Sequence, residues 1–385
     1  MLARNELPFS VEEYRSRLEK VRAQMAAAGV EVMLTTVPEN ICYLTGYHTL
    51  GYFTYQILVV SLDRPPILLT RAMNMEKAQV DSCLEHIEGY ADTEDPDDAT
   101  HRVLDQYGLV RKRIGTQDDA WFFSVARYKK LVRRLGRDDL VDCSGLVERV
   151  RRVKSPREIA YIREAGRYCA ASLDAAIAAV RPGALETEVS AAAHHGLHQA
   201  GSEYLGHSPQ FVAGPQAGLG FECAGRRPIR EHDVVYMEAG GTHNRYNSML
   251  SRTVIVGKPD RRWIALAEAS RDALNAAKAA IRAGVTSHDV DRAARETIRR
   301  AGFGEHFQHR TGYSIGIGFP PDWGEGRIMS INANDPTVLE AGMCFHLIPD
   351  LKIALAGGVV FSESLAVTET GYDLLTPYSQ EIFYK

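Results

Sequence analysis

The chain has 385 residues, a formal net charge of −4 and a hydrophobic content of 45%. A chain of this length is expected to form roughly two to three domains, each able to bury its own core. Its balanced charge provides no basic surface for a phosphate backbone, so we expect no nucleic-acid partner and consider small molecules instead.

The positions of the cysteines and the hydropathy of the chain exclude further classes of protein. The six cysteines lie far apart and form no C-x-x-C motif, which argues against a zinc ribbon or a disulfide framework. The N-terminal segment is polar, without the apolar run of a signal peptide, and no stretch approaches the roughly 18 apolar residues of a membrane span. We therefore expect a cytoplasmic protein with no membrane partner.

The N-terminal part of the chain alternates helical and strand patterns up to about Gly145. Ser10 is a candidate N-cap for a helix whose apolar residues recur at three- and four-residue spacing until Gly29. This alternation favours a mixed α/β domain. The segments that follow the first helix are predicted as strands over 30–36, 55–62 and 65–70, with a loop over 38–47.

A domain boundary is predicted near residue 153. Ser155 and Glu158 form the sequence pattern of a capping box, with Pro156 at the first helical position. We therefore divide the chain into two domains, 1–153 and 154–385.

The second domain contains an internal repeat. Residues 175–201 align with residues 276–302, and in both a helix ends at a (Val/Ile)-Arg-x-Gly turn before a second helix that starts at a Ser/Thr and closes at Ala-Gly. Matching turns and lengths favour duplication over chance similarity of alanine-rich helices. Strand patterns follow each helical pair, so we predict two related α+β halves with a cleft between them.

Five motifs in this order resemble the creatinase and aminopeptidase P family. They are RVKSPREIAYIREAG, DVVYMEAGG with the later Ser-Arg-Thr, TGYSIGIGFPPDWGE, EAGMCFHLIPD and SLAVTETG. The resemblance implies an α+β chain with an N-terminal creatinase-type α/β domain and a C-terminal pita-bread domain of two pseudo-symmetric halves. It also implies a homodimer, with the 43–55 segment as a candidate to reach the partner's site.

The metal positions of the family's peptidases are largely replaced in this chain. The five ligand positions of that pattern fall on Glu238, Met249, Tyr313, Ile348, and Ser362 or, with a one-residue slip, Glu363. A thioether, a phenol and an alkyl group cannot replace carboxylate and imidazole ligands. We therefore predict no metal and no other cofactor.

Two metal-free subfamilies, the creatinases and the ectoine hydrolases, resemble the chain in this respect, and GGTHNRYNSMLSRT looks particularly similar to the ectoine hydrolase version. The predicted function is metal-independent hydrolysis of a non-peptide C–N bond in a small cationic or zwitterionic compound, such as an amidine, a guanidino compound or a cyclic amide. The upstream histidine of creatinases has no clear match here. The alternatives are an Xaa-Pro dipeptidase-like metallopeptidase and a catalytically inactive binding protein.

Four residues are candidates for catalysis. Glu238, at the end of a buried strand pattern, is the predicted nucleophile or general base, and Glu363 is a second acid whose direction depends on strand register. Tyr313, expected in a glycine-rich loop, and His346, expected in a strand, are candidate proton donors, although a lone histidine in a strand is often a core residue. Candidates for substrate binding are Arg252, His243, Tyr246, Asp322, Trp323 and Glu325.

Overall fold

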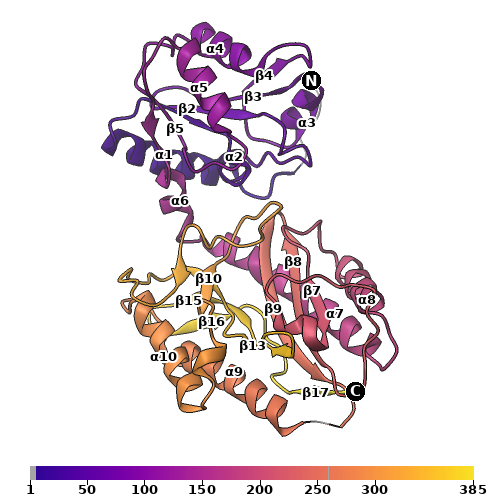
Figure 1. Ribbon diagram of the computed structural model, residues 1–385. Coiled ribbons are helices and arrows are strands. Elements are labelled where there is room, and N and C mark those ends of the chain that lie inside the picture. Colours follow the sequence, from indigo (N-terminus) through magenta and orange to yellow (C-terminus); the bar gives the residue numbers. More distant parts are fainter. Residues whose placement is uncertain (1–5, 259) are drawn as a thin grey trace. The chain divides into compact units, whose positions relative to one another are not determined.

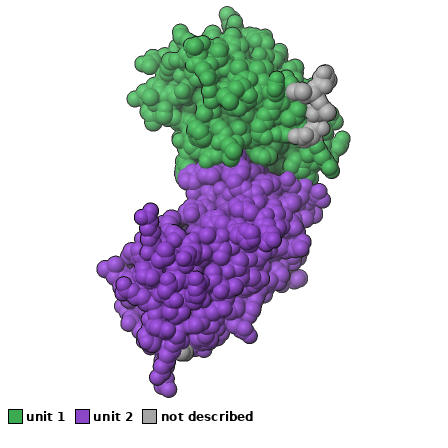
Figure 2. Space-filling view, turned by 90° about the vertical axis from the view of Figure 1, so that its right-hand side faces the viewer, with its two compact units in different colours: residues 1–151 green, residues 152–385 purple. Residues whose placement is uncertain are grey.

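The computed structural model describes residues 6–258 and 260–385, which form two compact units, 1–151 and 152–385 (Figures 1 and 2). The predicted boundary after residue 153 lies two residues from this division. Within the described residues, none of the helices has the length and apolar content needed to cross a membrane.

Unit 1 is built around a mixed six-stranded sheet in the order β4-β3-β2-β1-β5-β6. Ser10 caps the first helix as predicted, its hydroxyl accepting a hydrogen bond from the Glu13 amide. The helices are α1 (Val11–Ala27), α2 (Pro38–Thr45), α3 (Met75–Val80), α4 (Pro96–Gln106), α5 (Val125–Arg134) and α6 (Leu146–Arg151). The strands are β1 (Val32–Thr35), β2 (Ile57–Ser61), β3 (Ile67–Arg71), β4 (His86–Tyr90), β5 (Ile114–Thr116) and β6 (Val141–Asp142).

Helix α2 corrects the loop predicted over 38–47. Pro38 occupies the start of this helix, where its missing N–H costs nothing, and Gly46 ends it in the left-handed conformation with φ of 81°. The residues between them are almost entirely buried, so tertiary packing stabilises a helix that has little surface periodicity.

Unit 2 contains the predicted repeat as two helical pairs. Gly183 and Gly284, which occupy equivalent turns, adopt φ of +86° and +84°. The second helix of the first pair begins after Leu185, so the Ser/Thr start predicted for both pairs holds only for the second, which Thr286 caps. The pairs are α7 (Pro156–Ala179) with α8 (Glu186–Gln199) and α9 (Arg261–Ala280) with α10 (Ser287–Arg300).

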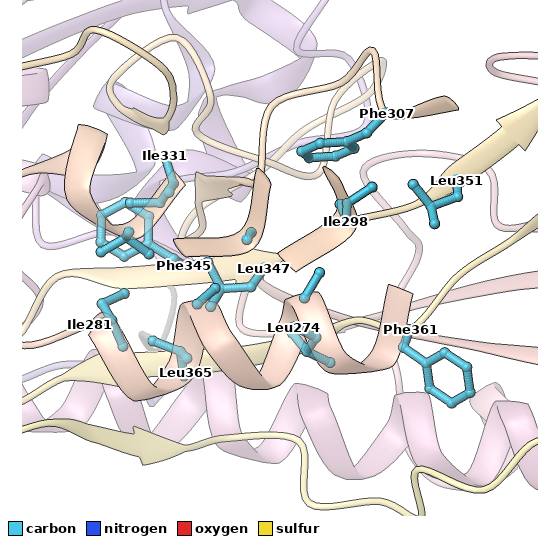
Figure 3. Packing of buried hydrophobic residues seen from close by; sticks show 14 of the residues in the cluster. Leu274, Ile281, Ile298, Phe307, Ile331, Phe345, Leu347, Leu351, Phe361 and Leu365 are labelled. Atoms are coloured by element: carbon cyan, nitrogen blue, oxygen red, sulfur yellow. The ribbon is translucent and has the colours of Figure 1, made fainter. Parts of the chain in front are cut away.

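Each helical pair covers one sheet of unit 2 (Figure 1). The first sheet has the order β17-β9-β8-β7 and the second β11-β10-β12-β15-β16, while β13 and β14 form a separate pair. Figure 3 shows side chains of the second sheet, including Phe345, Leu347 and Leu365, packed with Leu274 of α9 and Ile298 of α10. The strands are β7 (Gln210–Ala213), β8 (Val234–His243), β9 (Tyr246–Ile255), β10 (Gly312–Ser314), β11 (Ser330–Ile331), β12 (Cys344–Leu347), β13 (Leu351–Ile353), β14 (Gly357–Val359), β15 (Glu363–Val367), β16 (Tyr372–Leu374) and β17 (Phe383–Tyr384).

Candidate functional site

Strand alternation on β8 separates an apolar face from a polar one. Met237 and Ala239 belong to the core cluster that includes residues of α7 and α8. Because successive side chains of a strand point to opposite faces, Tyr236, Glu238 and Gly240 share the other face, which we call the inner face of β8.

The second sheet alternates in the same way. Phe345 and Leu347 of β12 belong to the core beneath α9 and α10, so His346 points to the opposite, inner face. Tyr313 of β10 lies directly opposite His346 in the strand register. Tyr313 is therefore a strand residue, not part of the predicted loop.

Trp323 connects the two inner faces. Its indole Nε1 donates to the Tyr313 hydroxyl at 3.2 Å. Its ring also lies against Gly240, where an added Cβ would come within 2.5 Å of ring carbons. Trp323 thus occupies the space that the absence of a side chain at Gly240 leaves, and it joins β8 to Tyr313.

Glu238 is a buried carboxylate in this arrangement, with 4% of its surface exposed. Gln210 of β7, its register partner, donates a hydrogen bond from Nε2 to Glu238 Oε2 at 3.0 Å. Burial raises the pKa of Glu238 to about 7, while the Lys352 cation lowers it and the Asp350 carboxylate raises it. A carboxyl group with this pKa exchanges protons readily near neutral pH.

Tyr313 and His346 form a hydrogen-bonded pair next to Glu238. The Tyr313 hydroxyl lies 3.0 Å from His346 Nδ1. Burial lowers the pKa of His346 to about 3, so its imidazole is neutral at pH 7. Burial, followed by the charge of Glu238, raises the pKa of Tyr313 well above its usual value, so the phenol keeps its proton.

Several buried polar atoms near these residues have no hydrogen-bond partner within the part of the chain that the structure describes. They include Ser251 Oγ, Ser362 Oγ and His346 Nε2. Ser251 lies opposite Glu238 in the register and forms a β-bridge with Ser362. Because buried polar groups are normally satisfied, these atoms indicate a place for water or a polar ligand.

The structure does not bring Glu363 and Arg252 to this site, which corrects both predictions. Glu363 lies opposite Leu347, on the helix-facing side of its sheet. It accepts from Lys278 Nζ at 2.6 Å and from Arg252 at 3.3 Å, while Arg252 also donates to the carbonyls of Ser251, Ser362, Tyr378 and Ser379. The one-residue slip thus places Ser362, not Glu363, toward the inner face.

His243 and Tyr246 also lie elsewhere, because both belong to the helix-facing side of the β8–β9 hairpin. The Tyr246 hydroxyl donates to Glu158 at 2.8 Å, and His243 Nδ1 lies 2.9 Å from the Tyr168 hydroxyl. Both contacts attach the hairpin to α7, on the side away from Glu238.

The predicted binding residues of the 322–325 segment do not all lie in the site. Trp323 is in the site, and Asp322 is near enough for its charge to raise the pKa of Tyr313. Glu325, predicted to bind substrate, is instead a buried ion-pair partner of Lys154 at 2.7 Å.

Three site residues were missed by sequence reasoning, namely Gln210, Asp350 and Lys352. Lys352 Nζ forms an ion pair with Asp350 Oδ2 at 2.8 Å and lies 4.8 Å from the centre of the Tyr236 ring. Asp350 and Lys352 are two positions apart, a spacing that places side chains on the same face of an extended segment, and this spacing could have indicated the pair from the sequence.

The residues do not fit the two-metal centre of the family's peptidases. Of the expected ligand positions, Glu238 is the one carboxylate on an inner face, beside Met249, Tyr313 and Ser362, and Ile348 takes the place of a glutamate. Across residues 6–258 and 260–385, no three His, Cys, Asp or Glu side chains are grouped as metal ligands. The chemistry of these residues therefore has to proceed without a two-metal centre.

Comparison with family models identifies both units. Residues 160–369 match the model of metallopeptidase family M24, and residues 17–153 match the creatinase/prolidase N-terminal domain. The chain belongs to family M24. As an M24 member it is a hydrolase acting on C–N bonds, and the predicted creatinase-type and pita-bread domains are confirmed.

Two curated relatives match almost the whole chain. The ectoine hydrolase of Halomonas elongata is 30% identical, over 98% of this chain and 99% of that protein. An uncharacterised hydrolase/peptidase of Sinorhizobium fredii is 33% identical, with the same coverage of both chains.

Solved structures of other proteins agree with the fold. The Xaa-Pro dipeptidase from Bacillus anthracis superposes with a TM-score of 0.85 at 24% identity, covering 97% of this chain and 100% of that one. The N-terminal domain of FACT complex subunit SPT16 from Cicer arietinum gives 0.79 at 13% identity, over 98% and 100%. At these identities the likeness establishes the fold alone.

Proposed function

We propose that the protein hydrolyses a C–N bond of a cyclic amidine, in the manner that the name of the Halomonas elongata relative indicates, with Glu238 as the reacting carboxylate and without a metal. The observation that carries the proposal is the buried Glu238 with its pKa raised to about 7, beside a tyrosine and a neutral histidine. A cationic amidine is a natural partner for a buried carboxylate that has no ion pair within the described residues.

An amidinium differs from an amide in what it requires of the site. A neutral amide needs its oxygen polarised before attack, by a metal or by an oxyanion hole. A protonated amidine already carries positive charge at the carbon to be attacked. The site then has to supply a carboxylate, a water molecule and a proton for the leaving nitrogen.

Glu238 can supply all the proton transfers of this reaction. As general base, it takes a proton from water while the water oxygen bonds to the amidinium carbon. The resulting carboxylic acid donates that proton to the nitrogen whose C–N bond breaks. As the carbonyl forms, Glu238 takes the proton of the former water hydroxyl and passes it to the released amine, so that amidinium and water give an amide and an ammonium group. Attack by Glu238 itself is the alternative, through an acyl-type adduct that water then hydrolyses.

Tyr313, His346 and Trp323 provide orientation in this proposal. The Trp323 indole can only donate, so the Tyr313 oxygen accepts from it while staying next to His346 Nδ1. Fixed in this way, the phenol is placed to hydrogen-bond a substrate nitrogen or the attacking water.

The test is turnover of a cyclic amidine by protein from which metals have been removed with a chelator and whose metal content is then measured. We expect kcat unchanged on chelation and no stoichiometric metal. Metal-dependent cleavage of Xaa-Pro dipeptides would instead establish the peptidase alternative. Tight binding of the amidine without turnover would establish an inactive binding protein.

A further inference from the structure

An ion pair between Asp350 and Lys352 of β13 lies beside the inner face of β8. Lys352 Nζ contacts Asp350 Oδ2 at 2.8 Å, and the same ammonium group is 4.8 Å from the centre of the Tyr236 ring. The Tyr236 hydroxyl donates to Asp350 at 3.4 Å. Tyr236 and Glu238 share the inner face, so Lys352 lies at the wall of the candidate site.

The other buried cations near this region are engaged elsewhere. Arg252 binds Glu363 and four backbone carbonyls, and Lys278 binds Glu363 from α9. Lys154 binds Glu325. None of these three is available to a small anionic group at Glu238.

Lys352 has both free donor capacity and access. An ammonium group carries three N–H donors, and Asp350 is the one charged partner of Lys352 among the described residues. A quarter of the Lys352 side chain is exposed, whereas Asp350 is buried. Asp350 and the Tyr236 ring both hold the ammonium group of the lysine, so the remaining donors are oriented before a ligand arrives.

We propose that Lys352 binds a carboxylate of the substrate and that Asp350 positions Lys352. This inference rests on the proposed function and narrows its substrate class to amidines that also carry a carboxylate, that is, zwitterions. The amidinium end is held by Glu238 and the carboxylate end by Lys352, so the two opposite charges of the site fix the orientation of the ring.

A purely structural role for Lys352 is the competing explanation, because the ion pair also joins β13 to β8. Such a role predicts that loss of the lysine affects all substrates equally. A binding role predicts loss of selectivity for the carboxylate, expressed mainly in KM.

The experiment compares kcat and KM for a cyclic amidine carboxylate and for the same amidine as its carboxamide, using the unmodified protein, Lys352→Met and Lys352→Arg. We expect Lys352→Met to lower kcat/KM for the carboxylate by about tenfold or more, the size of one charge-assisted hydrogen bond, with little change for the carboxamide. Lys352→Arg should retain most of the selectivity. Equal losses for both compounds overturn the inference.

Arg310→Met is the matched control, because Arg310 is a second cation close to the site, 4.7 Å from the centre of the Tyr313 ring. Selectivity lost with Arg310→Met and kept with Lys352→Met also overturns the inference. If Lys352→Met does not fold, Asp350→Asn, which keeps the lysine, is measured in its place and should weaken the preference for the carboxylate. An unchanged preference in Asp350→Asn would then contradict the inference.

Failure of the proposed function is distinguishable from failure of this inference. If the unmodified protein turns over no amidine, binding of the same two compounds is measured by calorimetry. Preference for the carboxylate that disappears in Lys352→Met supports the inference alone. A preference that is the same in the unmodified protein and in Lys352→Met, or no binding of either compound, overturns the inference.

Discussion

Two buried glutamates on neighbouring sheets of unit 2 have opposite surroundings. Glu363 has two cations and the Gln380 amide, all within 3.3 Å, on the helix-facing side of its sheet. Glu238 has the neutral Gln210 amide at 3.0 Å on an inner face, and its pKa rises to about 7.

The difference separates structural from functional carboxylates. A buried charge with matched partners links elements of the fold, here β15, α9 and the C-terminal segment, and its removal leaves the partners uncompensated. A buried charge without an ion pair costs stability, and such groups are concentrated at functional sites. We therefore expect a Glu→Gln substitution to affect mainly activity at position 238 and mainly stability at position 363.

Glu238→Gln should give the largest effect on activity. The amide keeps the shape and can still accept from Gln210, but it cannot take a proton from water or attack the amidinium carbon. We expect kcat/KM to fall by roughly 10²- to 10⁴-fold in a steady-state assay of amidine hydrolysis. Glu305→Gln, on a largely exposed side chain, serves as the control and should leave the rate unchanged. Turnover retained in Glu238→Gln would remove the proposed mechanism.

The same variant should be more stable than the unmodified protein at high pH. Because folding raises the pKa of Glu238 from 4.5 to about 7, the native state holds a proton that the unfolded chain has lost, and stability falls as pH rises between these values. Above about pH 7 the full cost of about 3 kcal/mol applies, and Glu238→Gln avoids it. Denaturant unfolding at acidic and alkaline pH measures this difference.

Glu363→Gln should lower the stability of the protein and leave its activity unchanged, the reverse of Glu238→Gln. Arg252 and Lys278 would lose their buried counter-charge, so we expect a loss of about 3–5 kcal/mol in the free energy of unfolding. The fraction that stays folded should keep its kcat, because Glu363 points away from the inner faces. A drop in kcat comparable to that of Glu238→Gln, without loss of stability, would contradict this division.

Tyr313→Phe should give a smaller loss. The substitution removes the hydroxyl that accepts from Trp323 and lies next to His346, so kcat/KM should fall by about 10- to 100-fold, the effect of one positioned hydrogen bond. Thermal unfolding measured in parallel separates this loss from destabilisation. An unchanged rate would show that the phenol only packs.

Much of the fold was predictable because its signals are local. The capping box at Ser155 forms as predicted, and Gly183 and Gly284 adopt the same left-handed conformation in their turns. Helix α2 was missed because burial, which has no local signature in eight residues, stabilises it.

The site was only partly predictable, because strand register decides which side chains meet. The sequence leaves Ser362 and Glu363 equally plausible, and only the pairing of Glu363 with Leu347 resolves the choice. Arg252, His243 and Tyr246 were misplaced for the same reason, since a one-residue difference moves a side chain to the opposite face. Lys352 and Asp350 contact Tyr236 on the inner face of β8, although more than 100 positions separate them from it in the chain.

The dependence of kcat/KM on pH for a cyclic amidine tests the central claim most directly. An amidinium stays protonated across the range from about pH 5 to about pH 9, so the ionisation of the free enzyme governs the profile. If Glu238 must be ionised to react, kcat/KM should rise with a midpoint at about 7, the pKa that burial gives this carboxyl group. A profile that is flat through pH 7, with its acid limb near the ordinary glutamate value of 4.5, would contradict the account.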